Sequence, residues 1–236
     1  MRGRLLLLLA AALVAVAARA GPPGYETRAD HDPEGIGKFY FGREIAQTMG
    51  PGGIPWLDRP ERDAEERPGI VLAAMDLKPG EVVADLGAGS GYFSFKIAPE
   101  LLPDGKVLAV EIQDEMLDRI RARAAATHAP NVEAVKGTEA DPKLPENGVD
   151  TVLMVDVYHE LADPLEVMRR VVASLKPAGR VVFVEYRQED PSIPIKALHK
   201  MALAQLDTEM DAVGLTRIRT IETLPAQHIA IYARRK

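Results

Sequence analysis

The sequence predicts an α/β protein in which a mostly parallel sheet is covered by helices on both faces. Short strand-like runs alternate with segments that carry apolar residues at helical spacing, an alternation typical of parallel sheets buried on both sides. Only residues 223–226 separate the last two strand-like runs, which suits an antiparallel hairpin and is too short for a parallel crossover. We therefore expect a doubly wound, three-layer α/β/α fold whose seven-stranded sheet ends in an antiparallel C-terminal hairpin.

The elements are expected at regular intervals after residue 80. In the helix expected over residues 164–175, Leu165, Met168 and Val172 recur at helical spacing. Asp114 is placed to cap the helix that it begins, and a Lys-Pro-Ala-Gly sequence predicts a helix end after residue 175. The expected strands are 82–85, 107–111, 132–135, 151–155, 181–186, 217–222 and 227–233, and the expected helices are 92–101, 114–127, 164–175 and 203–213.

Composition and charge exclude several classes of function. Of the 236 residues 47% are apolar and 27% are charged, which is typical of a globular protein. There is no cysteine, so disulfides, thiolate metal sites and cysteine nucleophiles are excluded. The formal net charge of -6 argues against a nucleic-acid partner, because such proteins usually carry a basic surface.

The first twenty residues have the pattern of a secretory signal peptide. Two arginines precede fourteen uninterrupted apolar residues, 5–18, and Ala18-Arg19-Ala20 fits the cleavage pattern. Fourteen residues are short for a membrane span, which needs about twenty. We expect an exported protein, periplasmic or secreted. The alternatives are a membrane-anchored protein, whose only membrane contact is this segment if uncleaved, or a cytoplasmic protein.

An irregular arm is expected between the signal peptide, 1–20, and the main domain, 68–236. This segment, 21–67, is rich in Gly, Pro, acids and aromatics, and a short helix is expected near 41–49. One hypothesis is a lid that closes over a ligand, as active-site loops do. The alternative is an extension that packs on the core.

A glycine-rich turn follows the first expected strand of the main domain. Gly87, Gly89 and Gly91 form a G-x-G-x-G sequence after Asp85, and glycine lets the backbone bend sharply and lets a ligand approach closely. Tyr92 stands where a dinucleotide-binding sequence would have its last glycine, which counts against NAD or FAD. The Lys-Ser or Lys-Thr pair of a P-loop is also missing.

A carboxylate ends the next expected strand. Glu111 lies twenty residues past Gly91, at the place from which an acidic side chain in this kind of fold binds both hydroxyls of a ribose. An acidic partner at that position excludes a ribose phosphate. The turn and Glu111 together predict a nucleoside-containing ligand.

Residues 80–235 resemble the class I, Rossmann-like, S-adenosylmethionine-dependent methyltransferases of the branch that acts mainly on small molecules. This family also has the antiparallel C-terminal hairpin expected above. The resemblance covers about two thirds of the chain and rests on the order of its segments. These are 85–91 (DLGAGSG), 107–111 (VLAVE), 144–145 (LP) with 149–150 (VD), 155–160 (VDVYHE) and 175–179 (LKPAG).

The resemblance implies S-adenosylmethionine as the cofactor and a role for each matching residue. Asp85 and the backbone of the glycine turn would face its amino acid part, Glu111 would hold the ribose, and Ile112 would lie beside the adenine. Near the adenine amine the sequence departs from the family and leaves open whether Glu139 or Asp141 acts there. The predicted cofactor-binding residues are Asp85, Gly87, Ala88, Gly89, Gly91, Glu111, Ile112, Thr138, Glu139 and Asp156.

The acceptor-side groups are expected where the fourth and fifth strands end, since ligands of open α/β sheets lie at the carboxyl ends of strands. His159 is the best candidate for a general base because of its pKa, with packing as the alternative role. Tyr158 is a second candidate for catalysis or for the cavity wall. Lys196, His199 and Lys200 could attract an anionic acceptor or could simply face water.

No metal is expected. The sequence after His159 superficially resembles the H-E-x-x-H zinc motif, but Asp163 occupies its last position and a helix with two histidines on one face is missing. The absence of cysteine also counts against arsenic methylation. The predicted function is methyl transfer to a small or lipid-like acceptor. The alternatives are an exported binding protein without transferase activity and a nicotinamide-dependent dehydrogenase.

Overall fold

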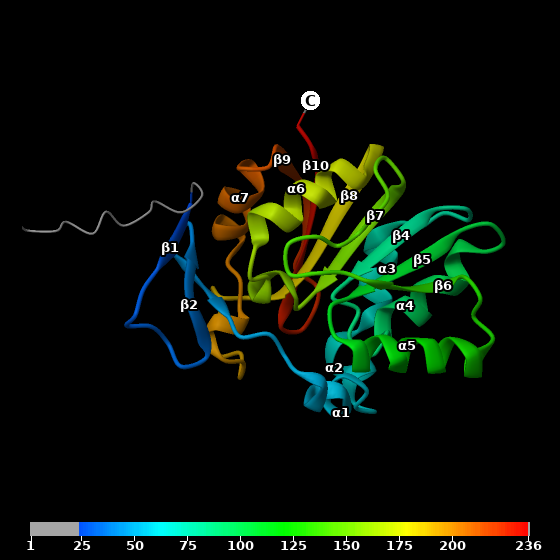
Figure 1. Ribbon diagram of the computed structural model, residues 1–236, viewed down its shortest axis with the longest axis horizontal. Coiled ribbons are helices and arrows are strands. Elements are labelled where there is room, and N and C mark those ends of the chain that lie inside the picture. Colours follow the sequence, from blue (N-terminus) through cyan, green and yellow to red (C-terminus); the bar gives the residue numbers. More distant parts are fainter. Residues whose placement is uncertain (1–23, 236) are drawn as a thin grey trace, which may run out of the picture.

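The described part of the chain consists of a small N-terminal sheet, a few short helices that follow it, and a three-layer α/β/α domain. The computed structural model describes residues 24–235 (Figure 1). The predicted signal peptide therefore lies outside the described residues. Among the described residues, no helix has the length and apolar character needed to cross a membrane.

A seven-stranded sheet forms the centre of the domain, with the strand order β6-β5-β4-β7-β8-β10-β9. The pairings among β4, β5, β6, β7 and β8 are parallel, whereas β10 is antiparallel to both of its neighbours. The predicted fold, including the antiparallel C-terminal hairpin, is confirmed. The strands are β4 (Val82–Leu86), β5 (Lys106–Glu111), β6 (Val132–Lys136), β7 (Val149–Val155), β8 (Leu175–Tyr186), β9 (Leu215–Ile221) and β10 (Gln227–Arg234).

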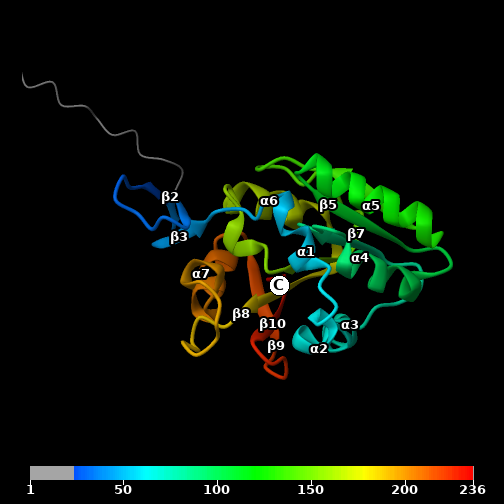
Figure 2. The same cartoon turned by 90° about the horizontal axis from the view of Figure 1, so that it is seen from below.

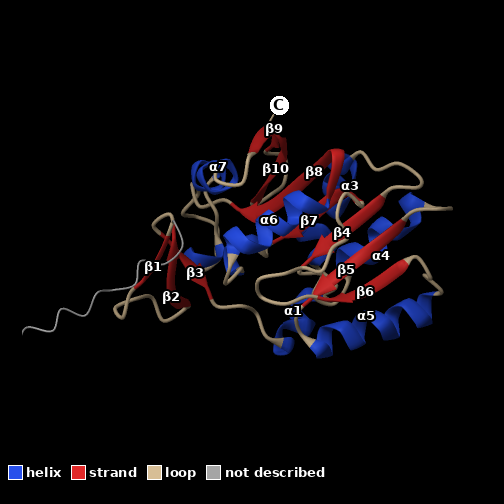
Figure 3. Ribbon diagram, turned by 45° about the horizontal axis from the view of Figure 1, so that its top comes forward, coloured by secondary structure: helices blue, strands red, loops and turns tan. Residues whose placement is uncertain are grey.

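Helices cover both faces of this sheet (Figure 3). Alternate residues of each strand point to opposite faces. Val83 packs against α3, α4 and α5, while its neighbour Ala84 packs on the side of α6 and α7. The helices are α3 (Pro68–Met75), α4 (Tyr92–Ile97), α5 (Asp114–Thr127), α6 (Pro164–Ser174) and α7 (Leu203–Asp211), and the 3₁₀ helices of the domain are η2 (Ala98–Leu101), η3 (Tyr158–Glu160) and η4 (Ala197–His199).

The arm begins as a three-stranded antiparallel sheet that lies beside α6 and α7 (Figure 2). Its strands are β1 (Tyr25–Thr27), β2 (Gly35–Tyr40) and β3 (Arg43–Ala46). The helix expected near 41–49 was wrong. Phe41 and Gly42 both have positive φ, which is the backbone of a two-residue hairpin turn, and Tyr40 pairs with Arg43 across it.

The rest of the arm runs from this sheet across to the domain as short helices, η1 (Pro51–Gly53), α1 (Ile54–Leu57) and α2 (Arg62–Glu66). Figure 2 shows α1 and α2 near α3 and α4, far from β1–β3.

The expected cap of α5 also needs correction. The helix begins at Asp114 as predicted, but Gln113 occupies the N-cap position and Asp114 pairs with Lys136 instead.

Candidate active site

A cavity of about 580 Å³ opens where β4, β5 and β7 reach their carboxyl ends. Pockets for small molecules typically have volumes of about 300–1,000 Å³ and lie at this edge of α/β sheets. The glycine turn and Glu111 line one part of it, and η3 and η4 line another. The arm contributes Met49, Trp56 and Leu57 to the wall.

The glycine turn is shaped by close packing as well as by its backbone conformation. Gly87 and Gly89 line the cavity and have φ values of 72° and 54°, in the left-handed region that favours glycine. A Cβ atom at Gly87 would lie 2.5 Å from both γ-carbons of Val157. The backbone therefore passes close to the cavity with nothing projecting from it. Ala88 also lines the cavity, whereas Gly91 does not. A Cβ there would meet Phe95, so the role of Gly91 is to let α4 begin.

Asp85 is the last residue but one of β4 and places a buried carboxylate at the wall of the cavity. Its Oδ2 accepts a hydrogen bond of 2.6 Å from Ser94 Oγ. Burial raises the pKa of Asp85 to about 6, although the hydrogen bonds from Ser94 lower it. Because burial disfavours the charged form of Asp85, a cationic group bound beside it would stabilise the carboxylate.

Glu111 ends β5 with its carboxylate turned toward the glycine turn. Its Oε2 accepts a hydrogen bond of 3.1 Å from Gly89 N–H, and its Oε1 accepts from the backbone N–H groups of Ile112 and Gln113 at 2.6 and 3.1 Å. Burial raises the pKa of this carboxyl group, and these three N–H donors oppose that rise. The side chain is thus fixed between β4 and β5, with its carboxylate on the cavity wall.

The residues expected beside the adenine lie together on the wall. Ile112, Thr138 and Glu139 all line the cavity, and Asp141 does not. Asp141 instead pairs with Lys143 at 2.8 Å, and its carbonyl oxygen accepts a hydrogen bond from Thr138 N–H. Of the two acidic side chains left open by the sequence, Glu139 is the one that reaches the cavity.

Asp156 offers an unpaired acceptor at the floor of the cavity. It follows β7 with φ 52°, and its Oδ2 accepts a hydrogen bond of 2.7 Å from Gln227 Nε2. Its Oδ1 is buried and has no hydrogen-bond partner in the described part of the chain. A buried acceptor without a partner costs free energy, so a donor on a bound ligand would be stabilising there. With Asp85, Glu111 and the glycine backbone, it gives a wall that fits S-adenosylmethionine.

His159 lies at the acceptor side in a chain of charged neighbours. Its Nδ1 is 2.6 Å from Glu185 Oε2, and its Nε2 is 3.1 Å from His199 Nδ1. Burial lowers the pKa of His159, but Glu185 and Glu160 outweigh that effect and raise it to about 10. In this arrangement the imidazole is protonated at neutral pH and donates hydrogen bonds instead of accepting a proton.

The structure corrects the expectation for Tyr158. Its side chain does not line the cavity but is fully buried in the core, where its ring makes an edge-to-face contact with Phe183. The hydroxyl donates a hydrogen bond of 2.7 Å to Glu209, which also pairs with Arg43. Tyr158 and His159 are adjacent in η3, and this turn directs the two side chains to different places.

The basic cluster after β8 is divided by the fold. Lys196 and His199 line the cavity, and Lys196 Nζ also pairs with Glu34 of the arm at 2.6 Å. Lys200 is buried and donates to the carbonyl oxygens of Asp190 and Ile193, so it neither faces water nor reaches the cavity.

Glu185 is a site residue that the sequence reasoning missed. It is completely buried, and besides His159 it accepts a hydrogen bond from Tyr158 N–H at 2.9 Å. Its signal was present, since a single carboxylate interrupts the apolar run of β8 near its carboxyl end. Arg62 and Glu66 of the arm, which pair with each other and line the cavity, carried no comparable signal.

Comparison with known proteins gives consistent results. Residues 84–181 match the family model described as a methyltransferase domain. An arsenite methyltransferase of Halobacterium salinarum is 32% identical over 115 residues, which are 49% of this chain and 29% of that protein. A demethylmenaquinone methyltransferase of Symbiobacterium thermophilum is 30% identical over 115 residues, or 48% of this chain and 46% of that protein. The chain thus spans less than half the length of these two curated relatives.

A solved structure extends the similarity over more of the chain. A SAM-dependent methyltransferase from Aquifex aeolicus superposes with a TM-score of 0.74 at 25% identity, covering 78% of this chain and 98% of that one. The sheet order, the glycine turn and these similarities lead to one assignment. Residues 84–181 form a methyltransferase domain, and the chain has the fold of the class I, Rossmann-like, S-adenosylmethionine-dependent methyltransferases.

Proposed function

We propose that the protein transfers the methyl group of S-adenosylmethionine to a small or lipid-like acceptor. The observation that carries this proposal is the carboxylate of Glu111 fixed against the glycine turn, in the same cavity as Asp156 and His159. Asp85 and Asp156 would hold the amino acid part, and Glu111 would accept hydrogen bonds from the ribose hydroxyls. Ile112, Thr138 and Glu139 would surround the adenine.

The chemistry asks the protein mainly for alignment. The bound cofactor supplies an electrophilic methyl group on a positively charged sulfur. The acceptor atom forms its bond to the methyl carbon as the sulfur–carbon bond breaks, the bonding electron pair stays on sulfur, and a protonated acceptor loses its proton. A cavity wall that holds the acceptor atom in line with the methyl group reduces the entropy that is lost on reaching the transition state. This can lower the activation free energy by several kcal/mol.

The lining of the cavity supports a small or lipid-like acceptor. Met49, Trp56 and Leu57 of the arm, with Pro194 and Ile195 before η4, contribute apolar surface to its wall. One relative is named for demethylmenaquinone and another for arsenite. This chain has no cysteine to hold arsenic, so of these two chemistries we favour an organic acceptor.

A second candidate function is binding of the cofactor without transfer. It is favoured by the predicted export signal, because S-adenosylmethionine is made in the cytosol. The two candidates separate in one experiment with a tritium-labelled methyl donor and a panel of quinols, phenols and lipid extracts. Labelled product above that formed by Asp156→Ala supports transfer. Tight cofactor binding in calorimetry with no labelled acceptor in any extract favours the binding protein.

Export is proposed on the sequence pattern of residues 1–20 alone. Cell fractionation of the natural host, followed by N-terminal sequencing, tests it. A mature chain that begins at Gly21 outside the cytosol is the expected result, and an intact N-terminus in the cytosolic fraction would refute export.

A further inference from the structure

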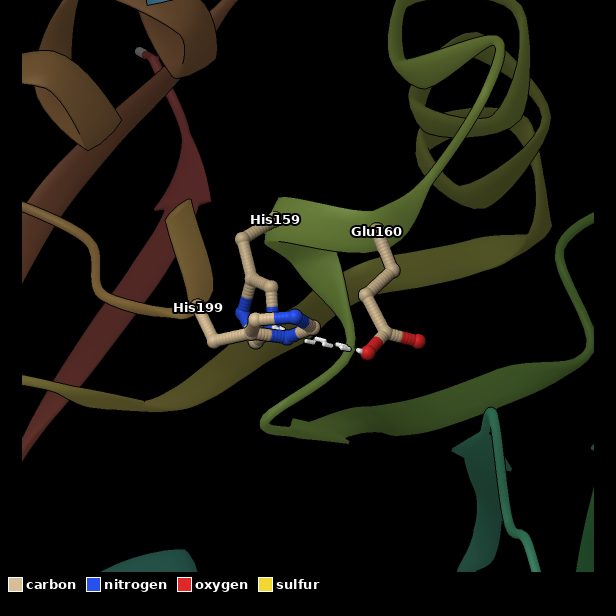
Figure 4. Close-up of side chains that lie close together, drawn as sticks. All are labelled: His159, Glu160 and His199. Carbon is tan, nitrogen blue, oxygen red and sulfur yellow. Dashed lines mark hydrogen bonds and ion pairs between the residues drawn. The ribbon is translucent and has the colours of Figure 1, made fainter. Parts of the chain in front are cut away.

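Two imidazoles and one carboxylate converge on one point of the cavity wall. His159 and Glu160 come from η3, and His199 comes from η4, forty residues later in the chain. Figure 4 shows the three side chains directed toward one another. Nε2 of His159 and Nδ1 of His199 are 3.1 Å apart, and Oε1 of Glu160 lies 3.2 Å from the His199 nitrogen and 3.8 Å from the His159 nitrogen.

We propose that His159, Glu160 and His199 bind one divalent transition-metal cation beside the methyl-donor site. Nitrogen and oxygen ligands lie about 2.0–2.2 Å from such an ion, so neighbouring ligands are about 2.8–3.1 Å apart in octahedral and about 3.3–3.6 Å apart in tetrahedral geometry. Two of the three separations lie between these limits, and the third exceeds the upper limit by about 0.2 Å. One ion fits between the three atoms with little movement.

The groups behind these ligands have the arrangement found around metal sites. A histidine ligand usually donates its second ring N–H to a carboxylate, which fixes its tautomer and orientation. Glu185 occupies this place at 2.6 Å from Nδ1 of His159. The second oxygen of Glu160 is held by Met49 N–H at 3.0 Å, which leaves Oε1 for the ion.

Charge also favours a cation at this point. Glu160 and Glu185 bring two carboxylates to a largely buried place, and no lysine or arginine forms a salt bridge with either of them within residues 24–235. Within this part of the chain both carboxylates form ion pairs only with the two imidazoles, and Arg43, which pairs with Glu209, acts on Glu185 from a greater distance. A divalent ion would balance both carboxylates and leave the imidazoles neutral as ligands.

Two histidines and one carboxylate make a set used by zinc and by iron(II). Three protein ligands leave coordination positions free, and all three residues line the cavity. Building on the proposed function, we infer that an oxygen atom of the acceptor takes a free position. The cation would lower the pKa of that hydroxyl group, so that its proton is lost to solvent and the oxygen attacks the methyl group.

This proposal replaces the sequence expectation of no metal. The H-E-x-x-H criterion looks for both histidines on one helix, whereas here the second histidine comes from a separate segment. The sequence places His199 in a basic cluster with Lys196 and Lys200, and the tertiary structure brings it next to His159.

Cobalt binding tests the site without any activity measurement. The full-length protein, purified without a polyhistidine tag and stripped with a chelator, is titrated with Co²⁺ and followed by visible absorption and calorimetry. We expect one equivalent to bind with d–d bands of a nitrogen–oxygen site. Affinity should fall at least about tenfold in His199→Ala and in Glu160→Gln. His128→Asn is the matched control, because His128 is exposed at the end of α5 in a left-handed conformation that asparagine tolerates.

Absence of cobalt bands, or equal affinity in His199→Ala and His128→Asn, would overturn the metal site. S-adenosylhomocysteine binding, measured on the same samples, reports separately on the proposed function. Cobalt binding together with no cofactor binding would uphold the metal site and refute the methyltransferase proposal.

Discussion

The carboxylate of Glu111 accepts a hydrogen bond from the backbone N–H of Gly89 at 3.1 Å, across the gap between two neighbouring strands. This contact joins the end of β5 to the turn after β4. It places an acidic side chain and a side-chain-free backbone on one cavity wall, the two features with which open α/β sheets bind nucleoside ligands.

Gly87→Ala should destabilise the protein by more than a positive φ alone would. The added Cβ would lie 2.5 Å from both γ-carbons of Val157, and the backbone conformation adds about 1 kcal/mol of strain. We expect a total loss of about 2–4 kcal/mol in urea unfolding. Gly80→Ala is the matched control, since Gly80 also has positive φ but a Cβ there would meet nothing within 4 Å. Equal losses in the two variants would show that Val157 does not constrain the turn.

Asp85→Asn should stabilise the protein at neutral pH and weaken cofactor binding. Burial raises the pKa of Asp85 from 3.8 to about 6, so its ionisation costs about 3 kcal/mol of folding stability. The folded protein has its full stability below the pKa that Asp85 has in the unfolded chain. It loses this contribution as the pH rises through the higher pKa that Asp85 has in the folded protein. The gain in the variant should therefore be larger at about pH 8 than at about pH 5. Urea unfolding at both values measures it, and a gain independent of pH would contradict the assignment.

Tyr158→Phe should cost stability and leave the kinetics unchanged. The variant loses the hydrogen bond to Glu209, worth about 1.5–3 kcal/mol when the acceptor is charged. Because the hydroxyl points into the core, kcat and KM should stay within about twofold of the wild type. Steady-state rates and thermal unfolding, measured on one preparation, test both halves. A large fall in kcat with stability retained would place Tyr158 in the chemistry.

Trp56 should report on whether the arm acts as a lid. It is the single tryptophan of the chain, lines the cavity, is 48% exposed and has Arg59 stacked on its ring. If the arm closes over a ligand, its emission should shift to the blue when S-adenosylhomocysteine saturates the protein. An unchanged spectrum, with binding confirmed by calorimetry, would favour the packing role instead.

The elements of the fold could be predicted because each depends on local pattern. The apolar runs of β4 and β5, the glycine turn and the helical spacing of α6 are all short-range signals. The hairpin at Phe41 and Gly42 was missed because phenylalanine seldom adopts positive φ, so the turn had no usual sequence sign.

The site was predicted on its cofactor side and less well on its acceptor side. Glu111 could be placed because strand ends of a parallel sheet meet at one edge. Glu185 and His199 follow His159 by 26 and 40 residues, and the three side chains meet only through tertiary packing. Nor does the sequence tell which of Tyr158 and His159 faces the cavity, since both belong to one short turn.

Calorimetry of S-adenosylhomocysteine binding to the wild type and to Glu111→Gln tests the central claim most directly. An amide cannot accept the three backbone hydrogen bonds and still hold the ribose hydroxyls, so affinity should fall roughly 10- to 100-fold. Glu133→Gln, an exposed change on the adjacent strand β6, should bind as the wild type does. Equal affinity in all three proteins, or binding of NAD in preference to S-adenosylhomocysteine, would contradict the account.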